Sequence, residues 1–402
     1  MSGLLPSRNT VGVSGDVLPE EVTTVAERFA DSGYTTACLS RNSYLSSETD
    51  LDRGFQRFQW LASSTIRSVG PRTLLKYLMN IRKHSAGLTA NTAKHASPLL
   101  MNDVAKHWLH DFESQSTPFF FYLHYNEPHR PYYPPLSYMD KYADDLEVAP
   151  KAAAERAYEI HETLDEIIAE GGRLDQSDWD VLRAMYDAEI AYTDEMVGRL
   201  VDYIDSLDLG DTIIVVTADH GELFGEYGLL SHKYVLHDSV IRVPLILNGL
   251  NTDLSVEETD IIQHNDVMRT LLEVAGADTT GHSGRDLREV RPEYAISQRG
   301  PIEFDRYPRD AETCGFDPFF SGTLSAIRTE DFKLLSDENR SVLLDIPDEE
   351  NAVGDDYPEE TSSLEKKLST VLDKEGAPIG KARKGDYSSA VKRQLTDLGY
   401  LE

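Results

Sequence analysis

The sequence has very little cysteine: Cys38 and Cys314 are the two cysteines among 402 residues. This excludes a small disulfide-stabilised protein and a zinc site built on a cysteine cluster, and it fits a reducing compartment. The sequence also has no run of 18 apolar residues, and its N-terminus lacks the apolar segment of a signal peptide. We therefore expect a cytoplasmic protein without a membrane span.

Positive charge is scarce as well. The 14 lysines and 25 arginines face 70 aspartates and glutamates, which gives a formal net charge of −31. A chain this acidic repels nucleic acids and anionic membranes, so we expect no nucleic-acid partner. The acid excess and the shortage of lysine predict a halophilic protein from an acidic proteome, in which high salt screens the self-repulsion. An ordinary acidic cytosolic protein is the alternative.

One segment lacks acids altogether. Residues 53–102 contain no aspartate or glutamate, yet they carry eight of the cationic residues. The segment is either the solvated face of a basic helical insertion, about 60–105, or an electropositive approach for an anionic substrate. Arginine outnumbers lysine five to three there, which suits bidentate contacts with oxyanions. On the second interpretation Arg82 and Lys83 bind the substrate and steer it toward His129.

Apolar runs of strand length alternate with helical patterns, which predicts an α/β fold with a mostly parallel, buried sheet. From about residue 291 onward, short runs separated by polar turns predict a small antiparallel sheet, then an acidic linker and a tail helix. The expected helices are 20–32, 151–171, a long one ending before Gly210, and 266–275; the expected strands are 35–39, 118–125, 213–216 and 243–247.

The clearest candidate for a catalytic or metal-binding motif follows the strand expected at 213–216. Asp219, His220, Gly221 and Glu222 come directly after it, where open α/β sheets place their ligand sites. A neighbouring carboxylate and imidazole can bind the same divalent cation if the backbone bends, which Gly221 permits. An aspartate that caps a helix, followed by a hydrogen-bonded histidine, would give the same motif.

Other histidines add to the candidate site. His129 lies between Pro128 and Pro131, which restrict its loop, and its imidazole could protonate a leaving group. His232 and Lys233 could neutralise the charge that develops on the oxygens of a transferring sulfuryl or phosphoryl group. We expect His124 and His237 to be structural.

Nine stretches follow one another in a characteristic order: LPEEVTTVAERFADSGYTTACLSRNSYL, LDRGFQRF, residues 122–135, YDAEIAYTDEMVGRL, VVTADHGELFGEYGLLSH, IRVPLIL, HNDVMRTLLEVAG, SAIRTEDFKLL and LLDIPDEEN. In this order they resemble the sulfatase family of the alkaline phosphatase superfamily, which includes arylsulfatases and phosphonate monoester hydrolases. The resemblance implies an alkaline phosphatase-like sandwich at 1–290, beside the C-terminal subdomain at 291–402. It also implies hydrolysis of sulfate or phosphate-type esters, with Asp219 and His220 on the metal and His129 and His232 as catalytic residues; Lys233 binds substrate or replaces His232.

The family's nucleophile has no counterpart in the sequence. Relatives begin with a metal-binding strand and a C-x-P-x-R signature whose cysteine becomes formylglycine, whereas SGLLPSRNTVG resembles the segment after it. LLPSR places Leu4 at the reactive position, and Cys38 lacks the proline and arginine, so we expect a buried thiol there. Without formylglycine, this chain is predicted to bind cations weakly and to turn over little. Either its start is misplaced or the chain has decayed, and its consistent strand and cap pattern favours the first explanation.

The resemblance leaves the cofactor and the activity open. One divalent ion is expected: an imidazole ligand suits Mn²⁺ or Zn²⁺, whereas an oxygen-rich site suits Ca²⁺. The expected partner is an anionic ester, such as a sulfated or phosphorylated glycan. The alternative to an ester hydrolase is a catalytically inactive protein that binds anionic glycans or phosphoesters through residues 53–102.

Overall fold

The computed structural model describes residues 1–402 except 14, 63, 116, 165, 166, 168–173, 231, 303, 305–314, 376–378, 380–382, 390 and 393–402. It divides into two compact units. The first comprises residues 1–33, 49–54 and 211–385, and the second comprises 34–48, 55–210 and 386–402. Each unit is described by itself.

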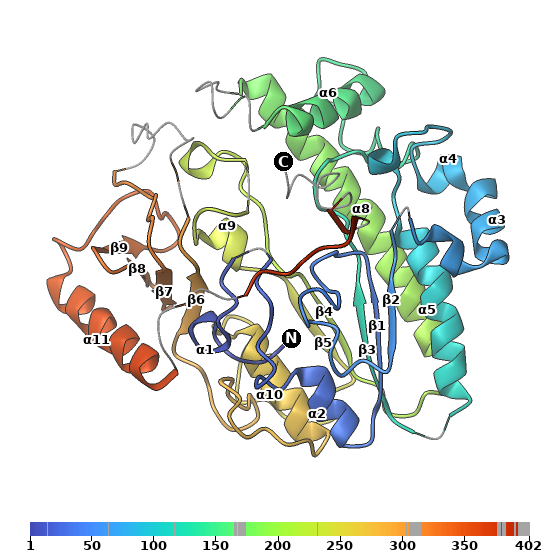
Figure 1. Cartoon of the computed structure of the whole chain (residues 1–402). Coiled ribbons are helices and arrows are strands. Elements are labelled where there is room, and N and C mark those ends of the chain that lie inside the picture. Colours follow the sequence, from blue (N-terminus) through green and yellow to red (C-terminus); the bar gives the residue numbers. More distant parts are fainter. Residues whose placement is uncertain are drawn as a thin grey trace. The chain divides into compact units, whose positions relative to one another are not determined.

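The second unit is built on a parallel sheet with the strand order β2-β1-β3 (Figure 1). Strand β1 (Thr35–Ser40) pairs with β2 (Arg57–Trp60) on one side and with β3 (Phe119–His124) on the other, with Cys38 opposite Phe58 and Tyr122. The crossover to β3 ends in helix α5 (Pro98–Glu113), whose Phe112 ring stacks on Phe119 at 4.7 Å. Cys38 is fully buried, which confirms the expected buried thiol.

Helices make up the rest of this unit. The acid-free segment forms η1 (Ile66–Val69), α3 (Pro71–Met79), α4 (Ile81–His84) and η2 (Thr92–Lys94), so it is helical as expected. Helix α6 (Pro150–Glu162) is followed by α8 (Gln176–Asp205), where Asp175 caps the N-terminus by accepting from the Asp178 amide. The buried stripe of α8 consists of Val181, Leu182, Ala184, Met185, Ala188, Tyr192, Met196 and Leu200.

In the first unit, β4 (Ile214–Thr217) pairs antiparallel with β5 (Leu245–Asn248). Helix α1 spans Pro6–Asn9, and α2 (Val25–Asp31) starts at a capping box formed by Thr24 and Glu27. The chain between β4 and β5 contains η3 (Glu226–Gly228) and α9 (Asp238–Ile241), and α10 (His264–Val274) follows β5.

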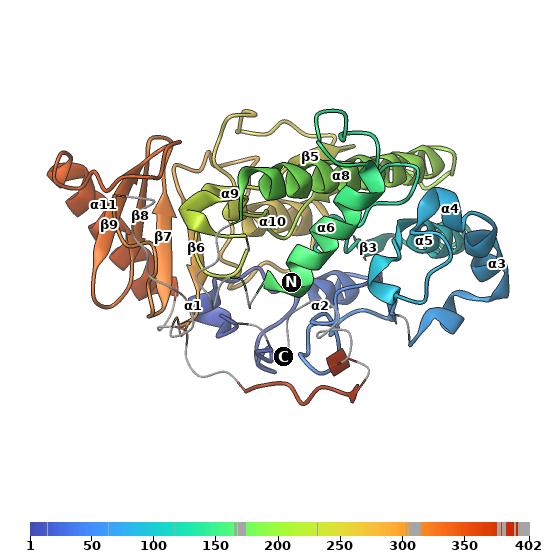
Figure 2. The ribbon, with the colours of Figure 1, turned by 90° about the horizontal axis from the view of Figure 1, so that it is seen from above.

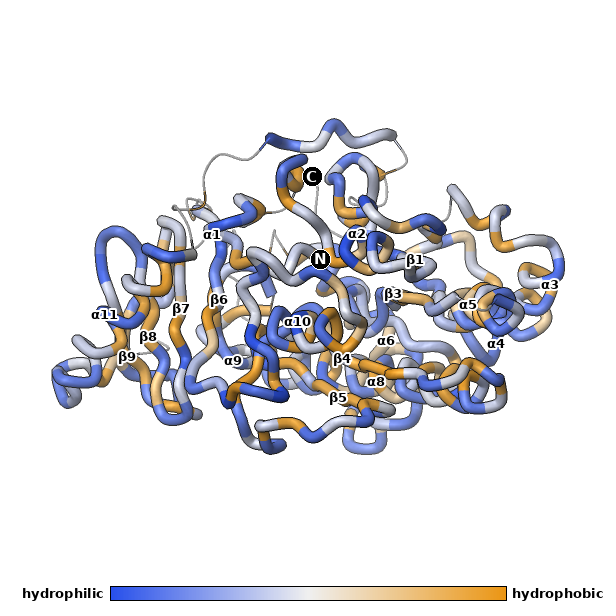
Figure 3. Tube along the Cα trace, turned by 90° about the horizontal axis from the view of Figure 1, so that it is seen from below, coloured by the Kyte–Doolittle hydropathy of each residue, from blue (hydrophilic) through white to orange (hydrophobic). Residues whose placement is uncertain are grey.

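The C-terminal part of the first unit is a four-stranded antiparallel sheet with the order β6-β7-β8-β9 (Figure 2). Its strands are β6 (Ala295–Arg299), β7 (Leu324–Arg328), β8 (Phe332–Ser336) and β9 (Ser341–Asp345). Apolar segments run along β7 and β8, and the turns that join the strands are hydrophilic (Figure 3). Helix α11 (Pro358–Glu375) packs Leu364 and Leu368 into the core of this sheet.

The structure corrects several expectations. The first helix begins at Val25 rather than at residue 20, because Thr24 caps it. The strands at 118–125, 213–216 and 243–247 are half-exposed rather than buried, since β3 is an edge strand and β4 pairs with β5 alone among the described strands. Strands β4 and β5 are antiparallel, so the described parallel sheet has three strands.

Further expectations concern the C-terminal region and the ends of helices. Helix α11 occupies part of the expected acidic linker. The helix expected at 151–171 is described as far as Glu162 in α6. The end of the tail helix, Cys314 and the Gly171-Gly172 stop lie outside the described residues, and the division at residue 290 stays a prediction. Among the described helices, none combines the length and apolar character needed to cross a membrane.

Candidate active site

Asp219 and His220 follow the carboxyl end of β4 in the first unit. The His220 backbone amide donates to Asp219 Oδ1 at 3.2 Å, and His220 Nε2 lies 3.9 Å from Asp219 Oδ2. His220 Nδ1 lies 2.8 Å from the Gly221 carbonyl, which can only accept a hydrogen bond, so Nδ1 carries the proton. In the neutral imidazole the lone pair is then on Nε2, the atom that faces the Asp219 carboxylate.

Gly221 is required for a different reason from the expected one. Its φ angle is not positive, but a Cβ at this position would lie 2.1 Å from the Ser239 carbonyl oxygen. The Gly221 amide donates to the Val240 carbonyl at 2.7 Å, so the chain after β4 lies directly against α9. The glycine therefore allows two backbone segments to approach closely, rather than a bend.

His232 lies against His220. The two imidazole rings stack with centroids 4.1 Å apart and an interplanar angle of 19°. His232 Nδ1 is 3.1 Å from both carboxylate oxygens of Glu222, and the side chains of this pair are only 6% and 4% exposed. The carboxylate can only accept a hydrogen bond, so Nδ1 of His232 carries a proton.

Buried cations from the C-terminal sheet hold the segment that carries His232. On β6, the Arg299 guanidinium donates to the carbonyls of Tyr234, Gly300, Gly322 and Phe320, and burial lowers its pKa to about 10. On β8, the fully buried Lys333 donates to the Leu236 carbonyl at 3.2 Å and pairs with Glu349 at 2.6 Å. These contacts fix the main chain just after Lys233.

The residues present fit part of a metal site. Asp219 and His220 offer a carboxylate and an imidazole nitrogen, a pair that suits Mn²⁺, Zn²⁺ or, with further oxygens, Ca²⁺. Among the described residues, no group of three or more His, Cys, Asp or Glu side chains is arranged to hold an ion. The pair can therefore supply two ligands of a larger set.

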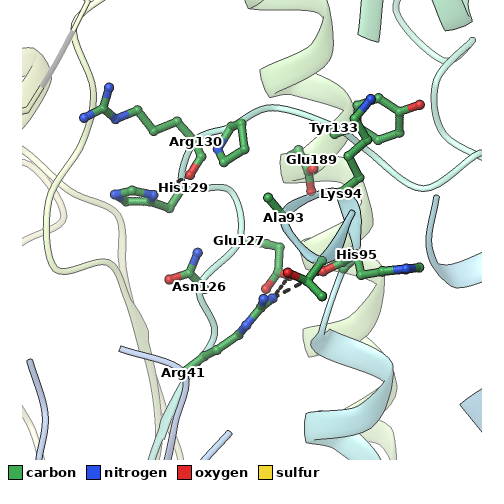
Figure 4. A pocket seen from close by; sticks show the side chains of 13 residues that line it. Arg41, Ala93, Lys94, His95, Asn126, Glu127, His129, Arg130, Tyr133 and Glu189 are labelled. Atoms are coloured by element: carbon green, nitrogen blue, oxygen red, sulfur yellow. Dashed lines mark hydrogen bonds and ion pairs between the residues drawn. The ribbon is translucent and has the colours of Figure 1, made fainter. Parts of the chain in front are cut away.

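His129 belongs to the second unit, where it lines a small polar cavity (Figure 4). Its Nδ1 donates to the Arg130 carbonyl at 2.7 Å, so Nδ1 carries a proton and, in the neutral ring, Nε2 carries the lone pair. The peptide bonds before Pro128 and Pro131 are both cis. His129 is thus presented from a short loop after β3 with a defined tautomer.

Two carboxylates anchor this loop on either side of His129. Glu127 pairs with Arg41 at 3.2 Å and accepts from the amide and hydroxyl of Ser97, before α5. Glu189 on α8 is buried and accepts from the Tyr133 backbone amide, but its Oε2 has no hydrogen-bond partner among the described residues. Burial, and then the charge of Glu127, raise the pKa of Glu189 well above its ordinary value.

Arg82 and Lys83, the predicted substrate-binding residues, are exposed on α4. Neither is among the described residues that line the cavity around His129, whereas Lys94 of the same segment is. Acids from outside the segment pair with several of its other cations: Asp111 with Arg57, Asp103 with Lys76 and Glu155 with Lys94. Three of the eight cations of residues 53–102 are therefore neutralised locally.

A family model for sulfatases matches residues 1–277. The chain belongs to the sulfatase family. Curated relatives agree: the chain is 24% identical over 338 residues to the uncharacterized sulfatase YidJ of Escherichia coli K12, covering 79% of this chain and 63% of YidJ. It is 31% identical over 180 residues to the multifunctional alkaline phosphatase superfamily protein PehA of Trinickia caryophylli, covering 40% of this chain and 35% of PehA. The chain therefore spans less than two thirds of these relatives.

Solved structures show the alkaline phosphatase-like fold. The phosphonate monoester hydrolase of Agrobacterium radiobacter superposes with a TM-score of 0.68 at 20% identity, covering 93% of this chain and 84% of that one. The structure of BT4656 in complex with its substrate D-glucosamine-2-N,6-O-disulfate has a TM-score of 0.67 at 18% identity, covering 95% and 88%. The expected fold class is thus confirmed.

For this member of the sulfatase family, the structure brings together Asp219, His220 and His232 in one unit and places His129 in the other. The expected structural role of His237 fits its Nδ1, which caps α9 by accepting from the Ser239 amide. Sequence reasoning missed the roles of Glu222, Arg299 and Lys333. The available signal for Glu222 was its position in the sequence, two residues after His220 and ten before His232.

Proposed function

We propose that this chain is a metal-dependent hydrolase of sulfate or phosphate-type esters. The observation that carries the proposal is the stacked pair of His220 and His232 beside Asp219 at the carboxyl end of β4. Membership of the sulfatase family supports the reaction class, and the two relatives with solved structures act on phosphonate monoesters and on a disulfated glucosamine. A divalent ion held by Asp219 and His220 would supply positive charge that polarises the ester.

Side chains of this chain would orient the ester and transfer protons. The Glu222 carboxylate accepts from His232 Nδ1 and so orients the ring, whose Nε2 would face an oxygen of the transferring group. Nδ1 of His129 donates to the Arg130 carbonyl, and its Nε2 would carry a proton to a leaving oxygen. Lys233 adds a cation beside His232.

Metal binding provides the first test. In isothermal titration with Mn²⁺, Ca²⁺ and Zn²⁺, we expect binding to weaken by at least about 10-fold in Asp219→Asn. Asp211→Asn is the matched control, because Asp211 is exposed and precedes the same strand at its other end. Equal affinity of the wild type and Asp219→Asn, or no binding by the wild type, would overturn the metal assignment.

Turnover provides the second test, with 4-nitrophenyl sulfate and 4-nitrophenyl phosphate as probes. Any hydrolysis should require the metal and should fall by at least about 100-fold in His129→Ala and in Asp219→Asn. Hydrolysis that persists in Asp219→Asn contradicts the proposal. Metal-dependent binding of the sulfate ester without turnover would favour the non-catalytic binding protein.

Arg82 and Lys83 are proposed to steer anionic substrates. Because both are exposed, they should act on association rather than on chemistry. The double reversal to glutamate should raise KM for a polyanionic substrate and leave kcat within a few-fold. An unchanged KM would leave this part of the segment as a solvated helical face.

A further inference from the structure

A second cavity lies in the first unit, between α11 and the chain around the start of α10. Its volume is about 440 Å³, and it is open to solvent. None of its lining residues belongs to the candidate active site. Its lining residues come from α11, from Leu5 and from the chain around positions 264, 284 and 295. We call this cavity the α11 groove.

One face of α11 forms a wall of the groove. The lining positions of the helix recur at intervals of three or four residues, the spacing of a single helical face. This face carries all three lysines of α11 and none of its five acids. The positions are Ser363, Lys366, Lys367, Thr370, Val371 and Lys374.

This concentration of lysine is at odds with the composition of the chain. A protein with 14 lysines and a net charge of −31 places three of those lysines and Arg285 around one groove, and none of the described residues that line it is an acid. Eight residues separate Lys366 from Lys374, which sets them about 12 Å apart along the helix axis. Among the described residues, neither of these two lysines forms an ion pair. They are therefore available for an anion.

The other two cations of the groove are held in place. Lys367 Nζ lies 4.5 Å from the centre of the Tyr294 ring and 3.1 Å from Glu293, and Arg285 lies 5.1 Å from the same ring while it pairs with Asp266. Such fixed cations lose little side-chain freedom when a ligand binds. They give the groove a defined positive wall.

The rest of the lining argues for a ligand with hydroxyl groups. Asn265 Oδ1 is buried and has no hydrogen-bond partner among the described residues, and this acceptor needs a donor. Inorganic sulfate offers acceptors alone, whereas a sugar hydroxyl can donate. Leu5, Ile296 and Val371 provide apolar surface for the C–H faces of sugar rings, and serine and threonine hydroxyls line the same wall.

We propose that the α11 groove is a binding site for an anionic saccharide, whose sulfate or phosphate groups contact Lys366 and Lys374 and whose hydroxyls reach Asn265. This site is separate from the proposed hydrolytic centre. The inference does not depend on catalysis, because it rests on the lining of the groove alone.

Binding can be measured by isothermal titration of the full chain, at the lowest KCl concentration that keeps it folded by circular dichroism. The probes are a heparin tetrasaccharide, mannopentaose phosphate, an unsulfated chondroitin tetrasaccharide and a ten-residue oligoglutamate. We expect the heparin tetrasaccharide or the mannopentaose phosphate to bind, which identifies sulfate or phosphate as the preferred group. We expect the unsulfated chondroitin tetrasaccharide, whose only charges are carboxylates, and the oligoglutamate to bind at least about 10-fold more weakly.

Two matched pairs of lysine variants test whether binding depends on the groove or on the overall charge of the protein. Lys366→Gln with Lys374→Gln should weaken saccharide binding at least about 10-fold, whereas the matched pair Lys141→Gln with Lys151→Gln, on the other unit, should stay within about 2-fold. Asp219→Asn should leave binding unchanged, which distinguishes this site from the hydrolytic one. Absence of saccharide binding, equal losses in the two lysine pairs, or oligoglutamate binding as tightly as either charged saccharide would overturn the proposal.

Discussion

Lys333 is fully buried, and the structure shows what its charge balances. Its ammonium pairs with Glu349, whose side chain is 1% exposed, and neighbours Asp238, which also pairs with Arg328. Lys333→Met keeps most of the volume but leaves two largely buried carboxylates with one cation. Removing one partner of such a network costs about 3 to 5 kcal/mol.

This cost can be converted into a melting temperature. The unfolding entropy of about 2.1 cal/mol/K per residue gives roughly 0.8 kcal/mol/K for 402 residues, so 4 kcal/mol lowers Tm by about 5 °C. Differential scanning calorimetry at fixed KCl measures this shift. Lys151→Met, at an exposed lysine, is the control and should change the free energy of unfolding by less than about 0.5 kcal/mol.

The pH dependence identifies the cause. Burial already raises the pKa of Glu349 above its usual value, so the folded state holds this proton more tightly than the unfolded state. Loss of Lys333 raises that pKa further, and the added destabilisation therefore grows as the pH rises above about 4.5. Lys333→Met with Glu349→Gln should recover part of the stability. A Tm shift below about 1 °C, or a loss that does not change between pH 5 and 7, would refute the reasoning.

Four further outcomes are expected. Burial lowers the pKa of His84 and of His282 to about 4, so the free energy of unfolding, measured by urea denaturation, should fall as the pH drops from 6.5 toward 4. His84→Asn should make the free energy of unfolding less dependent on pH in this range, and an unchanged pH dependence would contradict the assignment. The raised pKa of Glu189 means that Glu189→Gln should gain stability relative to the wild type between pH 5 and 8, again by urea denaturation, and a constant difference would refute this. Gly221→Ala should lower Tm and weaken Mn²⁺ binding, because its Cβ meets the Ser239 carbonyl, whereas Gly198→Ala, which faces open space in α8, should not lower Tm. Finally, Tm should rise steeply between about 0.1 and 3 M KCl as salt screens the acid excess, and a flat Tm would exclude halophilic folding.

The local pattern of apolar residues was enough to predict the position of the helices and strands in which that pattern is strong. Strands β1 and β3 lie within one residue of the predicted ranges, and α10 begins two residues before the predicted start. Helix α11 was missed because acids and serines dominate its sequence and its core stripe is narrow. The exposure of β4 and β5 was not predictable either, since it depends on which strands pair with them.

The candidate site likewise has a part that the sequence predicted and a part that it could not predict. The Asp219-His220 pair is local, so the motif after an apolar strand could identify it. Its supports are not local: Arg299 reaches the Tyr234 carbonyl across 65 residues, and Lys333 reaches the Leu236 carbonyl across 97. Hydrogen bonds to carbonyls leave no residue-type signature at the accepting position, so no reading of the segment around His232 could have found them.

The anchoring of that segment by the C-terminal sheet has a consequence for dissecting the protein. The sulfatase match ends at residue 277, whereas Arg299, Arg328, Lys333 and Glu349, which hold residues 234–238, all come after it. An expression fragment cut at residue 277 would keep His129, Asp219, His220 and His232 and would lose the residues that hold the segment just after His232. Where a family resemblance stops is thus a poor guide to where this protein can be cut.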